Sequence, residues 1–291
     1  MTQYNDTFTV SPMNQRIELE PGEVYQGHIK VGNPATAKSE LKYQINVTPL
    51  GFAGEDYDAD LVTESNYTQI TNWITIDEPT GTLKPNEFKE ITFSINVPKD
   101  VPAGGQYASL LVSRDDGTGE NDNAVEIGSV LEMASLLYAR VNGKTRKEGE
   151  VVRNDIPSFA TGGPINTTIV VKNNGNVDSV MTPVVMAKNF FTGEVIIDGS
   201  DKSTYESEIV MPETTRAISK ELNNMPALGV VRVEQTVYYD GKPISSESKD
   251  LIICPIWFMI LVATALIVII EIIILLVKKH KAKKHKAKKE E

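Results

Sequence analysis

The stretches that decide the fold are LKYQINVT at residues 41–48 and ITFSINVP at residues 91–98. In both of them apolar and polar residues alternate with a period of two. Successive side chains of a β-strand point to opposite faces, so this pattern predicts strands with one face in a core and the other in water. An amphipathic helix would instead repeat its apolar residues every three or four positions. The pattern therefore predicts antiparallel strands from about Thr7 to Asn142.

Turn residues separate these predicted strands at regular intervals. The clearest clusters are Glu20-Pro21-Gly22, Gly32-Asn33-Pro34, Lys84-Pro85-Asn86 and Pro102-Ala103-Gly104-Gly105. Proline fixes φ and glycine permits a positive φ, which tight turns need. Short strands between regular turns are typical of an immunoglobulin-like (Ig-like) β-sandwich. The segment from Ala124 to Tyr138 is long and mixes apolar and polar residues without a clear period, so it could be either a strand or a helix.

A second unit repeats landmarks of the first. Pro102-Ala103 followed by Asp116-Gly117 matches Pro226-Ala227 followed by Asp240-Gly241, both at an offset of 124 residues. Two further pairs of matching positions are Val31 with Val171 and Leu83 with Val210. The simplest interpretation is a tandem duplication, which would place Val31 and Val171 on equivalent strands.

The end of the chain is of a different kind. An apolar run extends from Ile256 to Val277 and is interrupted only by Glu271. As a helix these residues would be about 33 Å long, which matches a hydrocarbon core of about 30 Å. The run therefore predicts a single transmembrane helix. An acid within such a helix is a functional candidate by default, and contact with another transmembrane helix is the expected use of Glu271. The alternative is that its carboxylate leans toward the headgroups.

Charge sets the expected orientation of that helix. The tail from Lys278 to Glu291 contains eight Lys and two Glu, and positively charged flanks face the cytoplasm. We therefore expect residues 1–255 outside the cell, with Trp257 and Phe258 at the outer interface. The first residues, MTQYNDTFTV, do not have the pattern of a signal peptide, so an exported protein would need one before Met1.

These arguments divide the chain into four parts. We expect an all-β protein of two tandem Ig-like sandwiches, at 1–144 and 145–250, a transmembrane helix at 251–277 and a basic cytoplasmic tail at 278–291. Without its tail the chain has 21 basic and 37 acidic residues, so nucleic acid is excluded as a partner. The only cysteine is Cys254, so no disulfide framework exists; this favours a bacterial surface. We expect Cys254 to be an apolar thiol, with lipid modification as the alternative.

Several of the turn and core motifs resemble a known family. Leu19-Glu20-Pro21-Gly22, Val31-Gly32-Asn33, Leu83-Lys84-Pro85 and Gly104-Gly105-Gln106-Tyr107 are arranged as in the first domain of the WxL-interacting surface proteins of Gram-positive bacteria. A second Ig-like domain and a single C-terminal membrane helix with a basic tail also match that family. The resemblance implies a membrane-tethered protein that contacts peptidoglycan with one domain and partner proteins with the other.

Catalysis is not expected. His28 is the only histidine before the predicted helix, and we expect it on the solvent side of its strand, so neither a zinc site nor a His-dependent triad can form. Asp56, Asp58 and Asp60 have the spacing of the first three ligands of a calcium loop, but Leu61 and Tyr67 replace its glycine and its final glutamate. We therefore expect a solvated acidic loop and no metal or cofactor.

The function expected from the sequence is that of a scaffold or binding protein of a Gram-positive-type envelope, anchored in the membrane and contacting cell wall and surface proteins. The first alternative is a tail-anchored adaptor of the major-sperm-protein type, whose Ig-like domains would face the cytoplasm. A hydrolase that uses the carboxylates of 51–72 is the third class. Trp73 is expected in the core, with a sugar-binding platform as its alternative.

Overall fold

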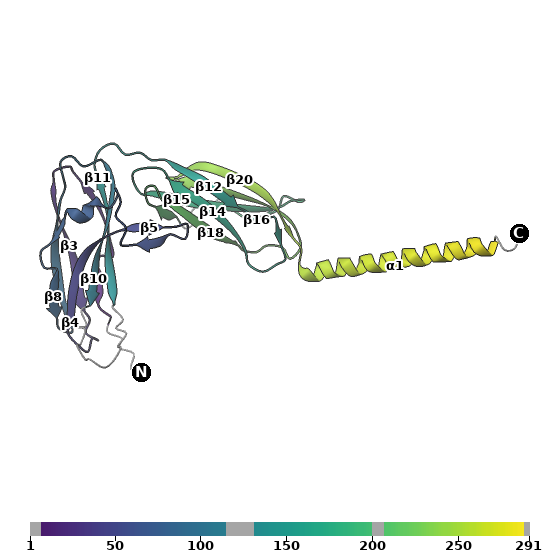
Figure 1. Cartoon of the computed structure of the whole chain (residues 1–291), viewed down its shortest axis with the longest axis horizontal. Helices are drawn as coiled ribbons and strands as arrows, with labels where there is room; N and C mark the ends of the chain where they lie inside the picture. Colours follow the sequence, from purple (N-terminus) through teal and green to yellow (C-terminus); the bar gives the residue numbers. More distant parts are fainter. Residues whose placement is uncertain (1–6, 115–130, 200–206, 288–291) are drawn as a thin grey trace.

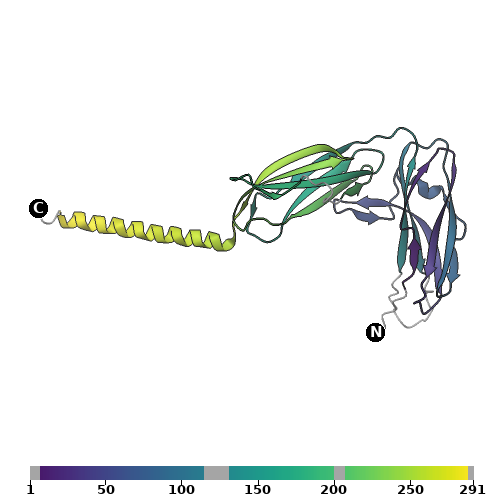
Figure 2. The same ribbon diagram turned by 180° about the vertical axis from the view of Figure 1, so that it is seen from behind.

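The computed structural model describes residues 7–114, 131–199 and 207–287. The described chain forms two β-sandwiches in succession, followed by one long helix, α1 (Ile256–Ala287). Figure 1 shows the sandwiches meeting at an angle, with α1 projecting from the far end of the second, and Figure 2 shows the same arrangement from behind. The protein is mostly β with Ig-type sandwiches, as expected.

The first sandwich has a four-stranded and a five-stranded sheet. The four-stranded sheet has the order β1 (Thr9–Ser11), β3 (Val24–Asn33), β9 (Glu87–Asn96) and β7 (Ile74–Ile76). The five-stranded sheet has the order β2 (Asn14–Leu19), β11 (Glu132–Val141), β10 (Gly104–Arg114), β4 (Leu41–Pro49) and β8 (Thr80–Leu83). All neighbouring strands are antiparallel except β2 and β11, which are parallel. The sequence left a helix open between Ala124 and Tyr138. The structure describes this segment from residue 131 onward, and Glu132–Val141 is a strand.

The second sandwich repeats this plan with its strands divided differently between the two sheets. Its smaller sheet has the order β12 (Gly149–Asp155), β14 (Ile165–Asn173) and β18 (Thr215–Leu222). Its larger sheet has the order β13 (Phe159–Ala160), β20 (Lys242–Ile253), β19 (Gly229–Tyr239), β15 (Ser179–Asn189) and β16 (Val195–Ile197), and β17 (Glu208–Val210) also pairs with β15. Among its described strands the parallel pair is again formed by an early strand, β13, and the last strand, β20.

The strand order agrees with the expected equivalence of Val31 and Val171. Val31 lies on β3, between β1 and β9, and Val171 lies on β14, between β12 and β18. In each sandwich this is an inner strand, next to the first strand of the sheet that does not contain the parallel pair. The Asp116-Gly117 landmark lies outside the described residues.

A pair of asparagines marks the same position in both sandwiches. The Asn33 side-chain amide donates to the carbonyl of Leu83 at 3.0 Å, and the Asn173 amide donates to the carbonyl of Val210 at 2.8 Å. Both asparagines are buried. A buried carbonyl needs a partner, so each asparagine joins the end of its own strand to the end of another.

The predicted alternation gives the core of the first sandwich. Leu41, Tyr43 and Ile45 on β4 are buried, and they pack with Ile91 and Phe93 of the opposite sheet. Polar residues between them are exposed or half-buried. The second sandwich has two smaller apolar clusters, which also draw on both of its sheets. The period of two thus predicts which side chains form the core.

The insertion at 51–72 is structured. It forms a two-stranded hairpin, β5 (Gly51–Ala53) and β6 (Asp58–Asp60), and a short 3₁₀ helix, η1 (Gln69–Asn72). In Figures 1 and 2 the hairpin, near the β5 label of Figure 1, points from the first sandwich to the second. The segment is therefore more than the solvated acidic loop that we expected.

The last strand runs almost directly into the helix. β20 ends at Ile253 and α1 begins at Ile256, so residues 251–253 of the segment expected as a transmembrane helix belong to the second sandwich, where Leu251 and Ile253 are buried. Within the described chain, Ile256–Lys279 is the one helix long and apolar enough to cross a membrane, and none of it is buried against the sandwiches.

Candidate functional site at the junction of the two sandwiches

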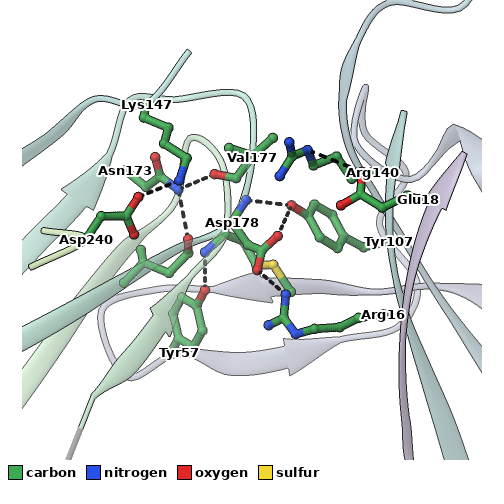
Figure 3. Close-up of polar contacts among 12 residues, drawn as sticks. Arg16, Glu18, Tyr57, Tyr107, Arg140, Lys147, Asn173, Val177, Asp178 and Asp240 are labelled. Carbon is green, nitrogen blue, oxygen red and sulfur yellow. Dashed lines mark hydrogen bonds and ion pairs between the residues drawn. The ribbon is translucent and has the colours of Figure 1, made fainter. Parts of the chain in front are cut away.

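The first contact across the junction joins Tyr107 of β10 to Asp178, the residue before β15 (Figure 3). The Tyr107 hydroxyl donates to Asp178 Oδ1 at 3.1 Å and accepts from the Asp178 backbone N–H at 2.8 Å. Arg16 of β2 donates to Asp178 Oδ2 at 2.9 Å. Burial, reinforced by the Asp178 carboxylate, raises the pKa of Tyr107, so its hydroxyl stays protonated and remains a donor.

The second contact is made by the tip of the β5–β6 hairpin. The Tyr57 hydroxyl accepts from the Met211 backbone N–H at 2.6 Å (Figure 3), and the Arg216 guanidinium lies 4.4 Å from the centre of the Tyr57 ring. The Glu55 carbonyl accepts from the Ala217 N–H on β18 at 2.7 Å. The hairpin therefore adds a backbone hydrogen bond to the outer edge of the second sandwich's smaller sheet.

The Glu55 side chain strengthens this contact. Its two carboxylate oxygens accept from Arg153 of β12 at 3.1 Å and 2.9 Å, a bidentate pair. Hydrogen bonds from Arg153 hold the pKa of the Glu55 carboxyl below its usual value. Arg153 also donates to Asp155, at 2.6 Å.

The third contact is a clamp around Asn176. The Asn176 carbonyl accepts from the Gly105 N–H at 2.7 Å, and its side-chain amide donates to the Ala103 carbonyl at 2.9 Å. Gly104 has a φ of +143°, and a Cβ there would lie 2.7 Å from the Asn176 carbonyl oxygen. Glycine is thus required at 104 both by its backbone conformation and by the close approach of the second sandwich.

Apolar packing accompanies the hydrogen bonds. Leu50, Tyr107 and Met211 form a buried cluster that draws on both sandwiches. Phe52 and Tyr57 of the hairpin stack with their ring centres 4.3 Å apart beside it. Hydrogen bonds at three places around an apolar centre fix the angle between the two bodies, whereas sandwiches joined by a linker alone would move independently.

A cleft of about 730 Å³ opens beside the Asn176 clamp. The side chains on which its chemistry depends are Tyr67, Trp73, Asn66, Gln69 and Asn176, and the rest of its wall is mainly the segment 98–106. Gln106 ties that wall together, because its side chain donates to the Asn66 carbonyl at 2.9 Å and accepts from the Ile70 N–H at 3.1 Å. The cleft combines an aromatic surface with uncharged amide groups.

A smaller cleft of about 170 Å³ on the junction is basic but neutralised. Its cations are Arg16, Arg140 and Lys147. Each has an acidic partner, which is Asp178 at 2.9 Å for Arg16, Glu18 at 3.6 Å for Arg140 and Asp240 at 2.6 Å for Lys147 (Figure 3). An incoming anion would have to compete with these carboxylates, so we do not assign an anion site here.

Residues singled out from the sequence lie mostly away from the junction. His28 is on the exposed face of β3, as predicted, with Nδ1 at 3.3 Å from the Thr92 hydroxyl. Asp60 Oδ1 accepts from the N–H groups of Val62 and Thr63, as in an ordinary turn. Among the described residues no group of three or more His, Cys, Asp or Glu side chains is placed to hold a metal ion. Glu271 lies on α1, beyond the end of β20 at Ile253, and is exposed.

Trp73 was expected in the core, with a sugar-binding platform as the alternative. It packs against the first core, and it also lines the large cleft. Sequence reasoning missed Tyr57, Tyr107 and Asp178. The available signals were a tyrosine within an otherwise polar insertion and the Gly104-Gly105 pair, which permits a close approach of another part of the chain.

The comparisons with known proteins give only a weak similarity. No protein-family model matches the chain, and no curated protein matches it either. Among solved structures, the chain is similar to the class 5 fimbriae chaperone CfaA at 13% identity, covering 84% of this chain and 99% of that one with a TM-score of 0.41. It is also similar to a CsuC–CsuE chaperone–tip adhesion subunit complex of Acinetobacter baumannii (15%, 84% and 98%, TM-score 0.40). A third similarity is to a Salmonella enterica SafA pilin–SafB chaperone complex (13%, 87% and 99%, TM-score 0.40).

These findings correct the expected relationship. The resemblance to WxL-interacting proteins is wrong, because no family model matches and the similar structures named above contain fimbrial chaperones. The expected function, a scaffold of a Gram-positive-type envelope that contacts the cell wall, is contradicted by the same finding. The motifs behind the resemblance are turn and core residues, which Ig-like sandwiches share for structural reasons.

Proposed function

We propose that the protein is a membrane-tethered binding protein whose cleft at the junction takes up an extended, uncharged segment of a partner protein. The observation that carries the proposal is the cleft of about 730 Å³ beside the Asn176 clamp. Ligand sites are typically clefts of about 300–1,000 Å³, occur preferentially at domain interfaces, and combine apolar surface with a few polar groups.

The lining determines the kind of segment. Asn66 and Gln69 each carry a side-chain amide that can both donate and accept, as the backbone of a peptide also does, whereas the Asn176 amide is engaged in the clamp. Trp73 and Tyr67 offer apolar surface for a side chain of that peptide. Burial raises the pKa of Tyr67, so this surface carries no phenolate charge at neutral pH. The charged residues of the lining, Lys99 and Asp100, have opposite signs, so the cleft favours no net charge.

The junction keeps the cleft in one shape. Asn176 belongs to the second sandwich, while most of the cleft wall belongs to the first, and the clamp holds the two together. A site that is already formed avoids the entropic cost of ordering its walls on binding. The proposal is a binding role without catalysis, since His28 lies on an outer face away from the cleft.

The tether is α1. Its segment Ile256–Lys279 would be about 36 Å long, enough for a hydrocarbon core of about 30 Å. The eight Lys from Lys278 onward support a cytoplasmic tail, and hence sandwiches on the opposite side of a single-pass membrane protein.

Photo-crosslinking tests the binding role. A photoreactive phenylalanine analogue at Gln69, on the exposed rim of the cleft, should give a discrete protein adduct in membranes that contain the full-length protein. The matched control is the same analogue at Val62, which is exposed and outside the cleft lining. Absence of a protein adduct at Gln69, or the same adducts from both positions, would contradict the proposal.

Protease accessibility tests the orientation. Protease applied from the non-cytoplasmic side should cleave the sandwiches and spare a tag placed after Glu291. Protection of the sandwiches together with cleavage of the tag would show that they face the cytoplasm.

A further inference from the structure

Exposed apolar side chains gather at the end of the second sandwich from which α1 departs. They are Phe159, Phe190, Phe191, Leu228 and Ile252, and Phe191 is the most exposed of them at 78%. Elsewhere on the sandwiches large exposed apolar residues such as Val62 and Phe88 occur singly, which is ordinary. An exposed apolar cluster of this kind marks an interaction surface.

Strand register places this set at a single end. Phe159 pairs with Ile252, and Gly229, which follows Leu228, pairs with Ile253. The Phe190 N–H donates to the Val230 carbonyl at 3.0 Å, which holds the β15–β16 turn beside the start of β19. Figure 1 shows β16 at the same end of the sandwich as the start of α1.

The turn holds its aromatic pair in a defined arrangement. The Asn189 side-chain oxygen accepts from the N–H groups of Phe191 and Thr192 at 3.0 Å and 3.1 Å. The rings of Phe190 and Phe191 meet edge to face with centres 5.1 Å apart. Arg232 lies 4.9 Å from the centre of the Phe190 ring and is paired with Asp250 at 2.8 Å. Two phenylalanines are therefore presented to the outside by a well-hydrogen-bonded turn.

The connection to the helix is very short. From Ile253 at the end of β20 to Ile256 at the start of α1 there are three Cα–Cα steps, which span at most about 11 Å. The Pro255 carbonyl accepts from the N–H groups of Phe258 and Met259, so the helix is already formed at this point. If α1 crosses a bilayer, this end of the sandwich cannot lie far from the bilayer surface.

We propose that this end of the second sandwich rests on the bilayer, with Phe190 and Phe191 inserted among the headgroups and upper acyl chains. The proposal rests on the proposed membrane span of α1. Aromatic side chains are enriched at that level of the membrane, and Trp257 at the start of α1 would lie at the same level. Since Arg232 is already paired with Asp250, the contact is apolar and needs no anionic lipid.

The test is lipid quenching of a fluorophore in the full-length protein. Cys254 is replaced by Ala, and single cysteines at Thr192, Val268 and Val62 are labelled with an environment-sensitive dye. The protein is reconstituted in phosphatidylcholine vesicles with or without a lipid carrying a nitroxide near its headgroup or along its chain. Position 268 reports insertion of the helix, and position 62, on the first sandwich, is the control for a label in water.

We expect quenching and a blue-shifted emission at 192 as well as at 268, and neither at 62. The double substitution Phe191→Ser with Phe190→Ser should abolish quenching at 192 while leaving that at 268 unchanged. Phe88→Ser, which removes an exposed phenylalanine of the first sandwich, should have no effect. Adding phosphatidylglycerol should not increase the quenching at 192.

Two outcomes would overturn the inference in distinguishable ways. Quenching at 268 with none at 192 would show that the helix inserts while the sandwich stands clear of the membrane. Absence of quenching at 268 would show that α1 does not insert in the bilayer, which would contradict both the proposed tether and this contact.

Discussion

Tyr107 and Asp178 exchange two hydrogen bonds across the junction, because one hydroxyl donates to the carboxylate at 3.1 Å and accepts from the backbone N–H at 2.8 Å. The two residues belong to different sandwiches and are 71 positions apart in the chain. The tyrosine is buried, and Arg16 satisfies the other carboxylate oxygen. This pair is one of the three hydrogen-bonded contacts that hold two similar sandwiches as one body with a defined cleft.

The first prediction concerns the Tyr107 hydroxyl. Tyr107→Phe should lower the free energy of unfolding by about 1–3 kcal/mol, since it leaves a buried N–H and part of a carboxylate without their partner. It should also broaden the distance distribution between spin labels placed on the two sandwiches.

Tyr43→Phe is the matched control for that change. The Tyr43 hydroxyl is buried in the first core and has no hydrogen-bond partner among the residues that the structure describes, so its removal should be neutral or stabilising. Urea unfolding of both variants measures the difference. Equal effects of the two substitutions would show that the bonds between Tyr107 and Asp178 do not hold the junction.

The second prediction concerns acid. Arg153 holds the pKa of Glu55 below its ordinary value of 4.5, and Asp155 shares the same guanidinium. Because the pKa is lowered in the folded state, the ion pair stabilises the hairpin contact fully at pH values above the ordinary pKa. This stabilisation is lost as the pH falls through the folded-state pKa. Hydrogen-exchange protection of the Ala217 N–H, which donates to the Glu55 carbonyl, should therefore decrease below about pH 4.5.

Glu55→Gln provides the control for the acid prediction. The variant cannot lose a charge, so its Ala217 protection should be weaker at neutral pH and should change less on acidification. The same pH dependence in the two proteins would locate the titrating group elsewhere.

The third prediction uses the internal repeat. Asn33→Ala and Asn173→Ala should each destabilise the protein by about 1–3 kcal/mol, because each leaves buried strand-end carbonyls without a donor. The effect should be larger at Asn173, whose side-chain oxygen also accepts from the Gly175 N–H at 2.9 Å. Asn96→Ala, at an exposed position of β9, is the control. If only one of the two substitutions lowered the free energy of unfolding, the two asparagine hydrogen bonds would not stabilise their sandwiches in the same way.

The sequence predicts the sandwiches well because their determinants are local. Alternation at Leu41, Tyr43 and Ile45 identifies the core face of β4, and the spacing of Val31 and Val171 identifies equivalent central strands. The turn cluster Gly32-Asn33-Pro34 also places Asn33 at the end of a predicted strand. What was not predictable was the bond that Asn33 and Asn173 each make to a carbonyl, which is 50 residues away in the first case and 37 in the second.

The junction could not be predicted because its partners carry no shared local pattern. Tyr57 and Met211 are 154 residues apart, and nothing in a polar insertion identifies the edge to which it binds. The acids of that insertion were expected in a solvated loop, whereas the structure uses the Glu55 carboxylate to bind Arg153. The start of α1 was placed too early for a related reason: Leu251 and Ile253 are apolar in a strand as they would be in a membrane helix.

The fourth prediction concerns Glu271 on α1. We expect it to contact another transmembrane helix, a type of interaction that contributes roughly 0.6 kcal/mol and at most about 2 kcal/mol. Glu271→Leu should therefore abolish one specific cross-linked adduct formed within the membrane, while Ile269→Leu, two positions away, should preserve it. An unchanged adduct pattern in the Glu271 variant would contradict the helix contact and favour the alternative, in which the carboxylate leans toward the headgroups.

The most direct test of the central claim is the yield of the Gln69 photo-adduct when the cleft is blocked. Asp100 lines the cleft and is exposed, so Asp100→Trp fills the cleft without disturbing a core; Asp77→Trp places the same side chain at an exposed position outside the lining. In membranes that contain the full-length protein, we predict that Asp100→Trp abolishes the protein adduct and that Asp77→Trp leaves its yield unchanged. An adduct that survives Asp100→Trp would contradict the assignment of the cleft as the binding site.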